Sequence, residues 1–295
     1  MQPLPLIIGL GEILWDVFPD VMHFGGAPAN FAFHARGLGA QAAVISAVGN
    51  DELGDRAVET LQSHGLIVSG VMRDDHPTGR VDVKIDAAGK PTYHFAPDCA
   101  WDHLRATEEA LALIHRAAVV CYGTLAQRSV ESQRSVIEML NRCESGTLRV
   151  FDVNLRGNFY SAETIRRSME VADVLKLNDE ELPIVAAACD CSGDGIEGLQ
   201  AIMRRFEIQT AALTLGSEGS VLVSGDKVDH ASPARVEVRD TVGAGDAFTA
   251  AFVIGLLLNQ PLSEIHHRAA QTAAYVCTQP GATPTLPTEL KMITA

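Results

Sequence analysis

Short apolar runs alternate with longer segments of helical character along most of the chain. Residues 6–10 are uniformly apolar, and residues 31–38 then have the composition of a helix. A second apolar run covers residues 42–48, and residues 49–64 predict another helix. Strands that alternate with helices in this way are typical of a parallel sheet covered by helices. The pattern therefore predicts an α/β fold.

The same alternation returns after Trp101 and continues along the rest of the chain. We expect strands at residues 118–122, 148–153, 174–177 and 211–215, a hairpin that starts at 220–223, and helices at 129–141, 162–171, 180–188, 195–206 and 262–277. There is no long linker, internal repeat or low-complexity tract. We therefore predict a single α/β domain over residues 1–295.

The segment between residues 71 and 99 breaks this pattern, because it predicts strands without an intervening helix. Residues 81–86 alternate between apolar and polar, Ala88-Gly89 supplies a turn, and residues 92–95 resume the strand. This is typical of a hairpin with one solvated face. Together with residues 12–24, it predicts a small β-sheet inserted into the domain, which could close over a site as a lid and exclude water.

Composition narrows the classes of partner. The formal net charge is −14, which argues against nucleic acids and anionic membranes, because both need a positive face. The six cysteines lack the spacing of a zinc site and are interpreted as reduced thiols. There is no basic leader, and no uncharged apolar run approaches the ~20 residues of a spanning helix. We expect a soluble, cytoplasmic protein.

One stretch near the end of the chain carries candidate chemistry. Residues 235–239 alternate and predict a strand, and the apolar run at 247–258 predicts a buried helix. Between them lie Gly243, Gly245 and Asp246. Glycines let backbone N–H groups approach an anion, and a helix N-terminus attracts negative charge. Asp246 would suit a base that acts on a hydroxyl beside a phosphate. Alternatively, Asp246 only caps the helix, as Asp often does.

Polar residues and glycines recur at the ends of the expected parallel strands. They are Gly11-Glu12 followed by Asp16, Asn154 and Arg156, Asn178 and Glu181, residues 216–219, and residues 243–246. The carboxyl ends of parallel strands form the ligand crevice of an α/β sheet. Each residue alone could be an ordinary loop residue, but together they predict a site.

Other motifs in the sequence give weaker evidence for a function. The sequence has no P-loop motif, and the Gly-x-Gly-x-x-Gly match at residues 193–198 follows a helical stretch instead of a strand. We interpret that match as a turn between helices, so a dehydrogenase that binds NAD is a weak alternative. The neighbouring His266 and His267 are expected on a solvated helix face, because adjacent helical residues point about 100° apart and rarely share a metal.

Four stretches together resemble the ribokinase-like (phosphofructokinase B) carbohydrate kinases. They are Gly25-Gly26-Ala27-Pro28-Ala29-Asn30 through residues 49–54, Asn178-Asp179-Glu180-Glu181, residues 214–219, and residues 240–248. The likeness covers essentially the whole chain. It implies a ribokinase-like three-layer α/β/α sandwich with a mostly parallel central sheet and a small β-sheet lid from about residues 12–24 and 71–99. It also implies phosphoryl transfer from ATP, with Mg²⁺, to a sugar.

The resemblance implies roles for individual residues. Asp246 would be the general base, with the backbone N–H groups of Gly243, Ala244 and Gly245 facing the transferring phosphoryl group. The sugar would contact Asp16, Gly25, Gly26, Asn30, Trp101 and Arg156. Asn178, Thr214, Gly216, Gly219, Gly243 and Gly245 would flank the nucleotide. Trp101 could instead pack under the lid, and Arg156 could instead be a structural ion-pair partner.

The resemblance also implies positions for two ions, and the sequence departs from the family pattern near the adenine. Glu181 would organise Mg²⁺ through water. A monovalent cation such as K⁺ would bind near Asp240 and Val242, beside residues 280–282. The helix at 269–274 commonly carries an Asn near the adenine in this family. Here either Gln271 takes its place or the adenine contacts are looser, so nucleotide preference is open.

The sugar is identified by local likeness. Residues 11–16, 25–30, 78–81 and 100–102 look like those of bacterial fructokinases, so we expect D-fructose to be phosphorylated at its primary 6-hydroxyl. Asp152-Val153-Asn154-Leu155-Arg156 is shared with kinases of 2-keto-3-deoxygluconate, whose carboxylate would want a cation. A ribokinase is a further alternative, as is a non-catalytic sugar- or nucleotide-sensing protein on the same fold. The exposed edges of a small sheet predict a homodimer through the lid.

Overall fold

The structure is a computed structural model that describes residues 4–85 and 91–293. Within that part of the chain, a nine-stranded sheet runs in the order β13-β12-β11-β10-β9-β8-β1-β4-β5. Its strands are β1 (Leu6–Leu10), β4 (Gln41–Gly49), β5 (Val71–Asp74), β8 (Ala117–Tyr122), β9 (Leu148–Asp152), β10 (Val174–Asn178), β11 (Thr210–Thr214), β12 (Ser220–Ser224) and β13 (Lys227–Ala231). Pairing is parallel from β11 to β5, and β12 and β13 add an antiparallel hairpin at one edge.

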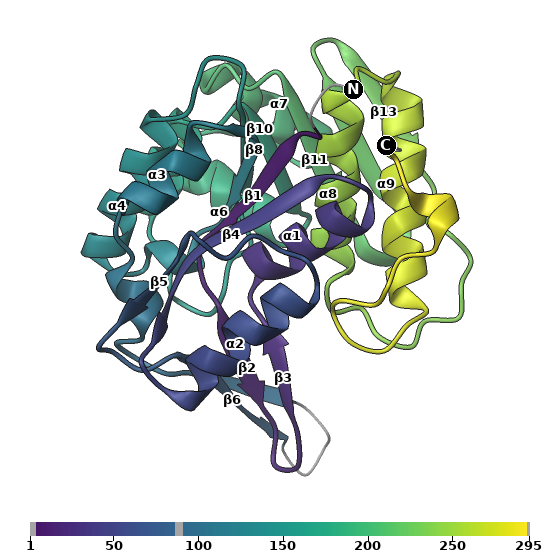
Figure 1. The fold of residues 1–295 in the computed structure, drawn as a ribbon. Coiled ribbons are helices and arrows are strands. Elements are labelled where there is room, and N and C mark those ends of the chain that lie inside the picture. The colour runs from purple at the N-terminus through teal and green to yellow at the C-terminus, as the bar shows by residue number, and fades with distance from the viewer. Residues whose placement is uncertain (1–3, 86–90, 294–295) are drawn as a thin grey trace.

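Helices cover both faces of this sheet (Figure 1). One face carries α1 (Ala27–Gly37), α2 (Glu52–Ser63), α8 (Ala244–Leu257) and α9 (Leu262–Cys277). The other carries α3 (Glu108–Ile114), α4 (Val130–Asn141), α5 (Ala162–Glu170), α6 (Glu181–Ala188) and α7 (Gly195–Arg205). Strand side chains alternate between two cores, so that Ile7 faces α1 and α8 while Ile8 faces the opposite group. The three-layer α/β/α prediction is confirmed.

A second, smaller sheet protrudes beyond α2 at the lower end of Figure 1. It consists of β2 (Leu14–Val17), β3 (Met22–Gly25), β6 (Gly79–Ile85) and β7 (Pro91–Phe95) in the order β3-β2-β6-β7. β2 pairs parallel with β6, and the other two pairings are antiparallel. The predicted hairpin is therefore β6–β7, while its expected turn at Ala88-Gly89 lies outside the described residues.

Three local expectations are wrong. Residues 235–239 form no strand, because this exposed segment passes beyond the β13 edge without a strand partner. β5 lies in the range expected to supply the small sheet, but it pairs with β4 in the large one. His266 is fully buried, where its Nε2 and Nδ1 bond Ser220 Oγ at 2.7 Å and Asp229 at 2.6 Å. Because adjacent helical residues diverge, only His267 of this pair is exposed.

Two other expectations concern motifs and membranes. The glycine-rich match at residues 193–198 begins between α6 and α7 and follows no strand, so it lacks the context of a dinucleotide site. Among residues 4–85 and 91–293, no helix has the length and apolar character needed to cross a membrane.

Candidate active site

Asp246 lies in the first turn of α8 without acting as its cap. The N-cap is Gly243, which has a left-handed φ of 78°, and no side chain caps this helix. The Asp246 carboxylate instead accepts a hydrogen bond from Asn30 Nδ2 at 2.9 Å. Burial, reinforced by the nearby charge of Asp152, raises the pKa of Asp246 to about 6. The structure therefore gives Asp246 no helix-capping hydrogen bond, so the capping interpretation is wrong.

Asn30 is brought to Asp246 by α1 and the glycine turn before it. Gly26 has a φ of 115°, and a Cβ there would lie 2.4 Å from the Glu12 carbonyl oxygen, so only glycine fits. Pro28 in the first turn of α1 has no N–H to satisfy and suits that position. Asn30 is buried, and among the described residues its Oδ1 has no hydrogen-bond partner. Buried polar atoms are nearly always bonded, so this oxygen indicates a place for a ligand hydroxyl.

A small cavity beside Asp246 is lined also by Glu12, Asp152 and Asn154. Burial raises the pKa of the Glu12 carboxyl to about 7, despite the lowering effects of its own backbone N–H and of Arg156. Asn154 holds a positive φ of 47° at the end of β9. The carboxyl ends of β1, β8 and β9 therefore converge on one acidic cavity next to the α8 N-terminus, as the strand-end argument predicted.

A buried cation lies beneath the glycine turn. Lys176 Nζ on β10 contacts Asp152 Oδ1 at 3.0 Å, and Thr249 Oγ1 donates to Asp152 Oδ2 at 2.8 Å. Burial acts to lower the pKa of Lys176, but the charges of Asp152 and Glu181 outweigh it and raise this pKa above its usual value. A Cβ on Gly245 would lie 3.3 Å from Nζ. The lysine thus adds positive charge where Gly243–Gly245 begins α8.

Glu181 and Asn178 are linked at the start of α6. Glu181 N donates to Asn178 Oδ1 at 2.8 Å, and Asn178 N donates to Glu181 Oε2 at 2.9 Å. Leu155 N donates to Glu181 Oε1 at 2.8 Å, which ties this carboxylate to the β9 end. Burial raises the pKa of Glu181, while the charge of Lys176 acts in the opposite direction. Each oxygen keeps a free lone pair, so the group fits a carboxylate that orients the waters of a Mg²⁺ ion.

The predicted sugar-side residues are only partly brought together. Asp16 on β2 is half-buried, and a Cβ on Gly25 would lie 3.0 Å from its Oδ2. Arg156 is exposed, yet its charge lowers the pKa values of Glu12, Asp16 and Asp246, so it faces the same region. Trp101 is not among the residues that line the cavity. It is buried between the small sheet and Arg128, whose guanidinium lies 3.9 Å from the ring centroid.

The predicted nucleotide-side residues lie along α9 and the edge of the sheet. Gln271 lines an open cleft of about 600 Å³ between α9 and residues 229–236. Gly219 has a φ of 100°, and a Cβ there would lie 2.0 Å from the Ala231 carbonyl oxygen. Gly216 has a φ of 54° with open space around it, and Thr214 ends β11 beside Asn178. Of these positions, Gln271 lines the cleft, and Gly219 packs against Ala231, which also lines it.

Asp240 fastens two loops next to that turn. Its Oδ1 accepts from Val242 N and its Oδ2 from Gly281 N, both at 3.0 Å. Gly243 packs against the Ala282 carbonyl, which also bonds His34 Nε2 at 2.9 Å. Burial lowers the pKa of His34 to about 4, so this histidine is neutral and donates through Nε2. The loops expected to hold a monovalent cation are thus in contact.

The sequence interpretation counted Glu12 among the strand-end residues and named Asp152 in a shared stretch, but it gave neither a role and did not single out Lys176 or Thr249. The available signal was polarity inside otherwise apolar runs, since Lys176 interrupts β10 and Asp152 ends β9. Lys and Asp are almost never buried unless paired, so two such residues on neighbouring strands predict an ion pair. Thr249 carried no signal of its own, because threonine is ordinary on a helix.

Comparisons with known proteins agree with this geometry. Residues 12–289 match the pfkB family carbohydrate kinases. An uncharacterized sugar kinase of Pyrococcus horikoshii is 28% identical over 270 residues (85% of this chain, 83% of that protein), and its crystal structure superposes with a TM-score of 0.83 over 94% of this chain and 93% of that one. The same protein has been solved in complex with ATP.

Two fructokinases are also similar. That of Salmonella typhimurium is 29% identical over 262 residues, which covers 85% of this chain and 84% of that protein. That of Vibrio cholerae, solved with fructose, ADP and calcium ion bound, is 25% identical with a TM-score of 0.80, over 98% of this chain and 96% of that one. The matched region includes every strand end of the site from Glu12 to Gly281. The chain is therefore a carbohydrate kinase with a ribokinase-like fold and belongs to the pfkB family.

Proposed function

We propose that this kinase transfers the γ-phosphoryl group of ATP to the 6-hydroxyl of D-fructose, with Asp246 as the general base. The observation that carries the proposal is the Asp246 carboxyl itself. Its pKa is about 6, Asn30 holds it at 2.9 Å, and it directly follows the glycine turn at the N-terminus of α8. A base with a pKa just below neutrality is ionised at pH 7 and still accepts a proton readily.

The chain's own groups can carry out each part of the transfer. Asp246 accepts the hydroxyl proton while that oxygen bonds to the γ-phosphorus and the bond to the β-phosphate oxygen breaks, leaving ADP. The N–H groups of Gly245 and Asp246 have no partner within the helix, as in any first helical turn. Ala244 N is directed back to Thr241 O at 3.3 Å. These amides and the Lys176 charge below them stabilise negative charge in transfer.

Mg²⁺ and a monovalent cation are proposed at the positions that the sequence indicated. Glu181 fits a Mg²⁺ site, because its buried carboxylate is oriented by two backbone N–H groups and keeps acceptor capacity. When bound, Mg²⁺ supplies charge neutralisation at the ATP phosphates. Asp240 with the loops at Val242 and Gly281 is the proposed place for K⁺. Gln271 and the cleft beside α9 are proposed to receive the adenine.

Fructose is the preferred substrate for two reasons. The relatives of Salmonella typhimurium and Vibrio cholerae are fructokinases, and the latter was solved with fructose. The site also offers hydrogen-bond acceptors suited to sugar hydroxyls. They are the Asp16 carboxylate, the glycine turn at Gly25-Gly26 and Asn30 Oδ1, which has no partner among the described residues. The second candidate, 2-keto-3-deoxygluconate, is favoured by one observation. Arg156 is exposed without a salt bridge among the described residues and could meet a carboxylate.

A substrate panel tests the proposal. ADP release should be measured with fructose, ribose, 2-keto-3-deoxygluconate and nucleosides, each across a concentration range. We expect the highest kcat/KM with fructose. Preference for 2-keto-3-deoxygluconate, lost in Arg156→Ala, would replace fructose by the second candidate. No turnover with any sugar would favour a sensing protein.

The small sheet is proposed to be the lid of a single kinase domain. Its β2–β3 hairpin carries Asp16 and Gly25, two of the residues proposed to contact the sugar, and leads into the Gly26 turn that precedes Asn30. Trp101 and Val81 are buried at its base, so the sheet is joined to the body through an apolar contact. Closure of this sheet would exclude water from the transferring phosphoryl group.

A further inference from the structure

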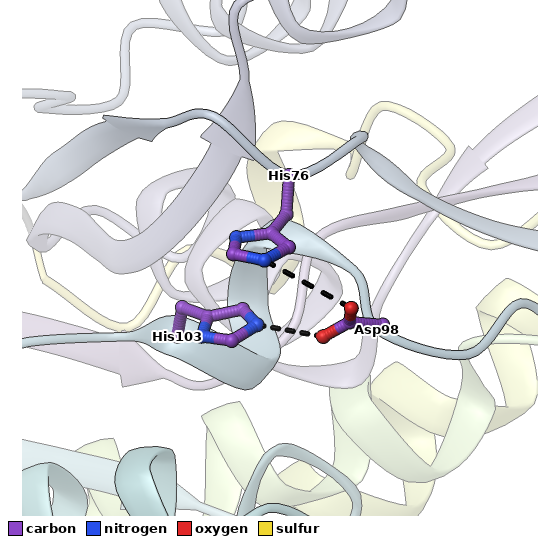
Figure 2. A group of neighbouring side chains, drawn as sticks. All are labelled: His76, Asp98 and His103. Carbon is purple, nitrogen blue, oxygen red and sulfur yellow. Dashed lines mark hydrogen bonds and ion pairs between the residues drawn. The ribbon is translucent and has the colours of Figure 1, made fainter.

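Two histidines and an aspartate meet where the small sheet joins the α/β body (Figure 2). His76 lies between β5 and β6, Asp98 follows β7, and His103 ends the short turn Ala100–His103. One nitrogen or oxygen from each residue lies within 4.8 Å of the others. His103 Nε2 is 2.7 Å from Asp98 Oδ1, and His76 Nε2 is 3.9 Å from Asp98 Oδ2. Three separate segments thus direct ligand atoms to one point.

The outer nitrogen of each histidine is held by a second carboxylate. His76 Nδ1 bonds Asp74 Oδ1 at 2.6 Å, and His103 Nδ1 bonds Glu131 Oε2 at 3.1 Å. These bonds place an Nδ1 proton on the outer side of both rings. His103 Nε2 lies 2.7 Å from a carboxylate oxygen, which can only accept, so without a metal this nitrogen also carries a proton and donates it to Asp98. A metal ion that binds here would displace that proton. Metal-binding histidines almost always have such an outer partner, which fixes the tautomer and the ring orientation.

A purely structural ion-pair cluster explains this arrangement less well. The two rings are stacked, with centroids 3.6 Å apart and planes 9° apart, so two imidazolium charges would repel each other. Asp98 has a side chain that is 71% exposed, and exposed ion pairs contribute little. Three carboxylates surround the rings, and Arg105 pairs with only one of them, Asp74, at 3.2 Å. With Arg105 on Asp74 and the second proton on His103, one negative charge of the three carboxylates is left over, and displacement of that proton by a metal ion leaves two, which favours a divalent cation.

We propose that His76, His103 and Asp98 bind a divalent transition-metal ion of the Zn²⁺ type. Two imidazoles and one carboxylate suit zinc, and water can complete a tetrahedral set. The site differs from the Mg²⁺ position at Glu181, since Mg²⁺ prefers oxygen ligands alone.

Binding requires the stacked rings to open, so that each Nε2 lone pair is directed at the ion from about 2.0–2.1 Å. The partly exposed side chains leave room for that rotation. The bound ion would link Asp98, which follows β7, to His76 in the β5–β6 loop, and so would stabilise the base of the small sheet.

Metal binding by the full chain, without nucleotide or sugar, tests the proposal. Zn²⁺ affinity is measured by competition with a chromogenic chelator, and Co²⁺ serves as a spectroscopic probe. We expect one Zn²⁺ per chain and an affinity at least tenfold weaker in His103→Ala and in the nearly isosteric Asp98→Asn. The outer variant Glu131→Gln should weaken binding about tenfold. The matched control is His115→Ala, because His115 pairs with Glu144 alone at 3.2 Å and should leave the affinity unchanged.

The Co²⁺ spectrum separates this site from the cysteines. Nitrogen and oxygen ligation gives d–d bands without a thiolate charge-transfer band. Equal Zn²⁺ affinity in wild type and His103→Ala, a thiolate band, or equal losses in His115→Ala would each overturn the proposal. Saturating Zn²⁺ should also raise the wild-type Tm by on the order of 5 °C at 100 times Kd, and should not raise that of Asp98→Asn. None of these measurements depends on phosphoryl transfer.

Discussion

As the proposed general base, Asp246 would act in its ionised form, so the carboxyl group has to lose its proton first. With a pKa of about 6, the carboxylate predominates above that pH and is lost as pH falls through it. We therefore expect kcat/KM of the wild type to fall below about pH 6. Asp246→Asn should lower kcat by about 10²–10⁴-fold, the usual contribution of a positioned base, while sugar binding persists. ADP release across pH and calorimetric sugar titration are the measurements. Unchanged turnover in Asp246→Asn would refute the assignment.

Asp246→Asn should lower activity but raise the free energy of unfolding. The folded pKa of Asp246 lies above its ordinary value of 3.8, so the native state binds this proton more tightly than the unfolded state does. Stability is therefore lost as pH rises from about 4 through 6. Because part of the group remains open to water, we expect Asp246→Asn to gain only about 1–2 kcal/mol at pH 8. Urea unfolding at pH 8 and pH 4 checks this, and an equal gain at both would contradict it.

Lys176 is expected to matter for folding as well as for charge at the site. Lys176→Met would leave the Asp152 carboxylate buried beside Thr249 without its cation, at a cost of about 3–5 kcal/mol. The double variant Lys176→Met/Asp152→Asn removes both charges and should cost clearly less than the sum of the single variants. Denaturant unfolding of the four proteins gives this cycle. Additive losses would show that the two groups do not interact.

At the scale of single residues, sequence predicted those that precede or follow strands and missed those inside them. Asp246, Asn30 and Glu181 stand in first helical turns and Asn178 ends β10, positions where polarity is informative. Lys176 lies inside β10, where the apolar pattern identified a strand but not what the strand holds. Trp101 was ambiguous because a large aromatic ring can line a cavity or fill a core, and only its neighbours decide.

Helices and strands were predicted correctly where the apolar residues follow a single spacing. The parallel strands are short apolar runs buried on both faces, and β6 shows a clean alternation that predicts a half-solvated strand. Residues 235–239 show an equally clean alternation and form no strand, since pairing depends on a neighbour that sequence does not reveal. The first turn of α8 was also missed, because the apolar run that predicted the helix begins at residue 247, whereas α8 begins at Ala244. The glycines there do not favour a helix, and the helix start depends on the packing of Gly243 against Ala282.

That helix start gives a prediction with a matched control. Gly243 and Gly216 both have positive φ, 78° and 54°. A Cβ at Gly243 would lie 2.2 Å from the Ala282 carbonyl oxygen, whereas nothing lies within 4 Å of one at Gly216. We expect Gly216→Ala to cost about 1–2 kcal/mol from backbone conformation alone. Gly243→Ala should cost more and abolish turnover, because the α8 N-terminus must shift. Similar losses in both variants would contradict the role of close packing.

At the scale of the whole molecule, the small sheet leaves two strand edges and apolar side chains exposed. β3 and β7 are its outer strands, Tyr93 on β7 is 55% exposed, and Val21 beside β3 is 49% exposed. Uncovered edges of this kind invite pairing with another strand. We therefore expect a homodimer in which two small sheets cover each other, and particles of twice the 31.5 kDa chain mass in light scattering at low concentration.

Tyr93→Lys should shift that dimer toward the monomer, because burying an unpaired ammonium group at the interface is costly. Ile184→Lys is the control, since Ile184 is 38% exposed on α6, whose main contacts are with α5, α7 and β10. A dimer that persists in Tyr93→Lys would place the interface elsewhere, and a wild type that scatters as a single chain at every concentration would refute assembly. If the dimer forms through these sheets, each lid closes against a fixed partner, so Tyr93→Lys should also raise the KM for sugar more than it lowers kcat. A larger effect on KM than on kcat, measured by ADP release, would show that the partner subunit positions the lid. Unchanged kinetic constants would show that the dimer contact has no effect on the site.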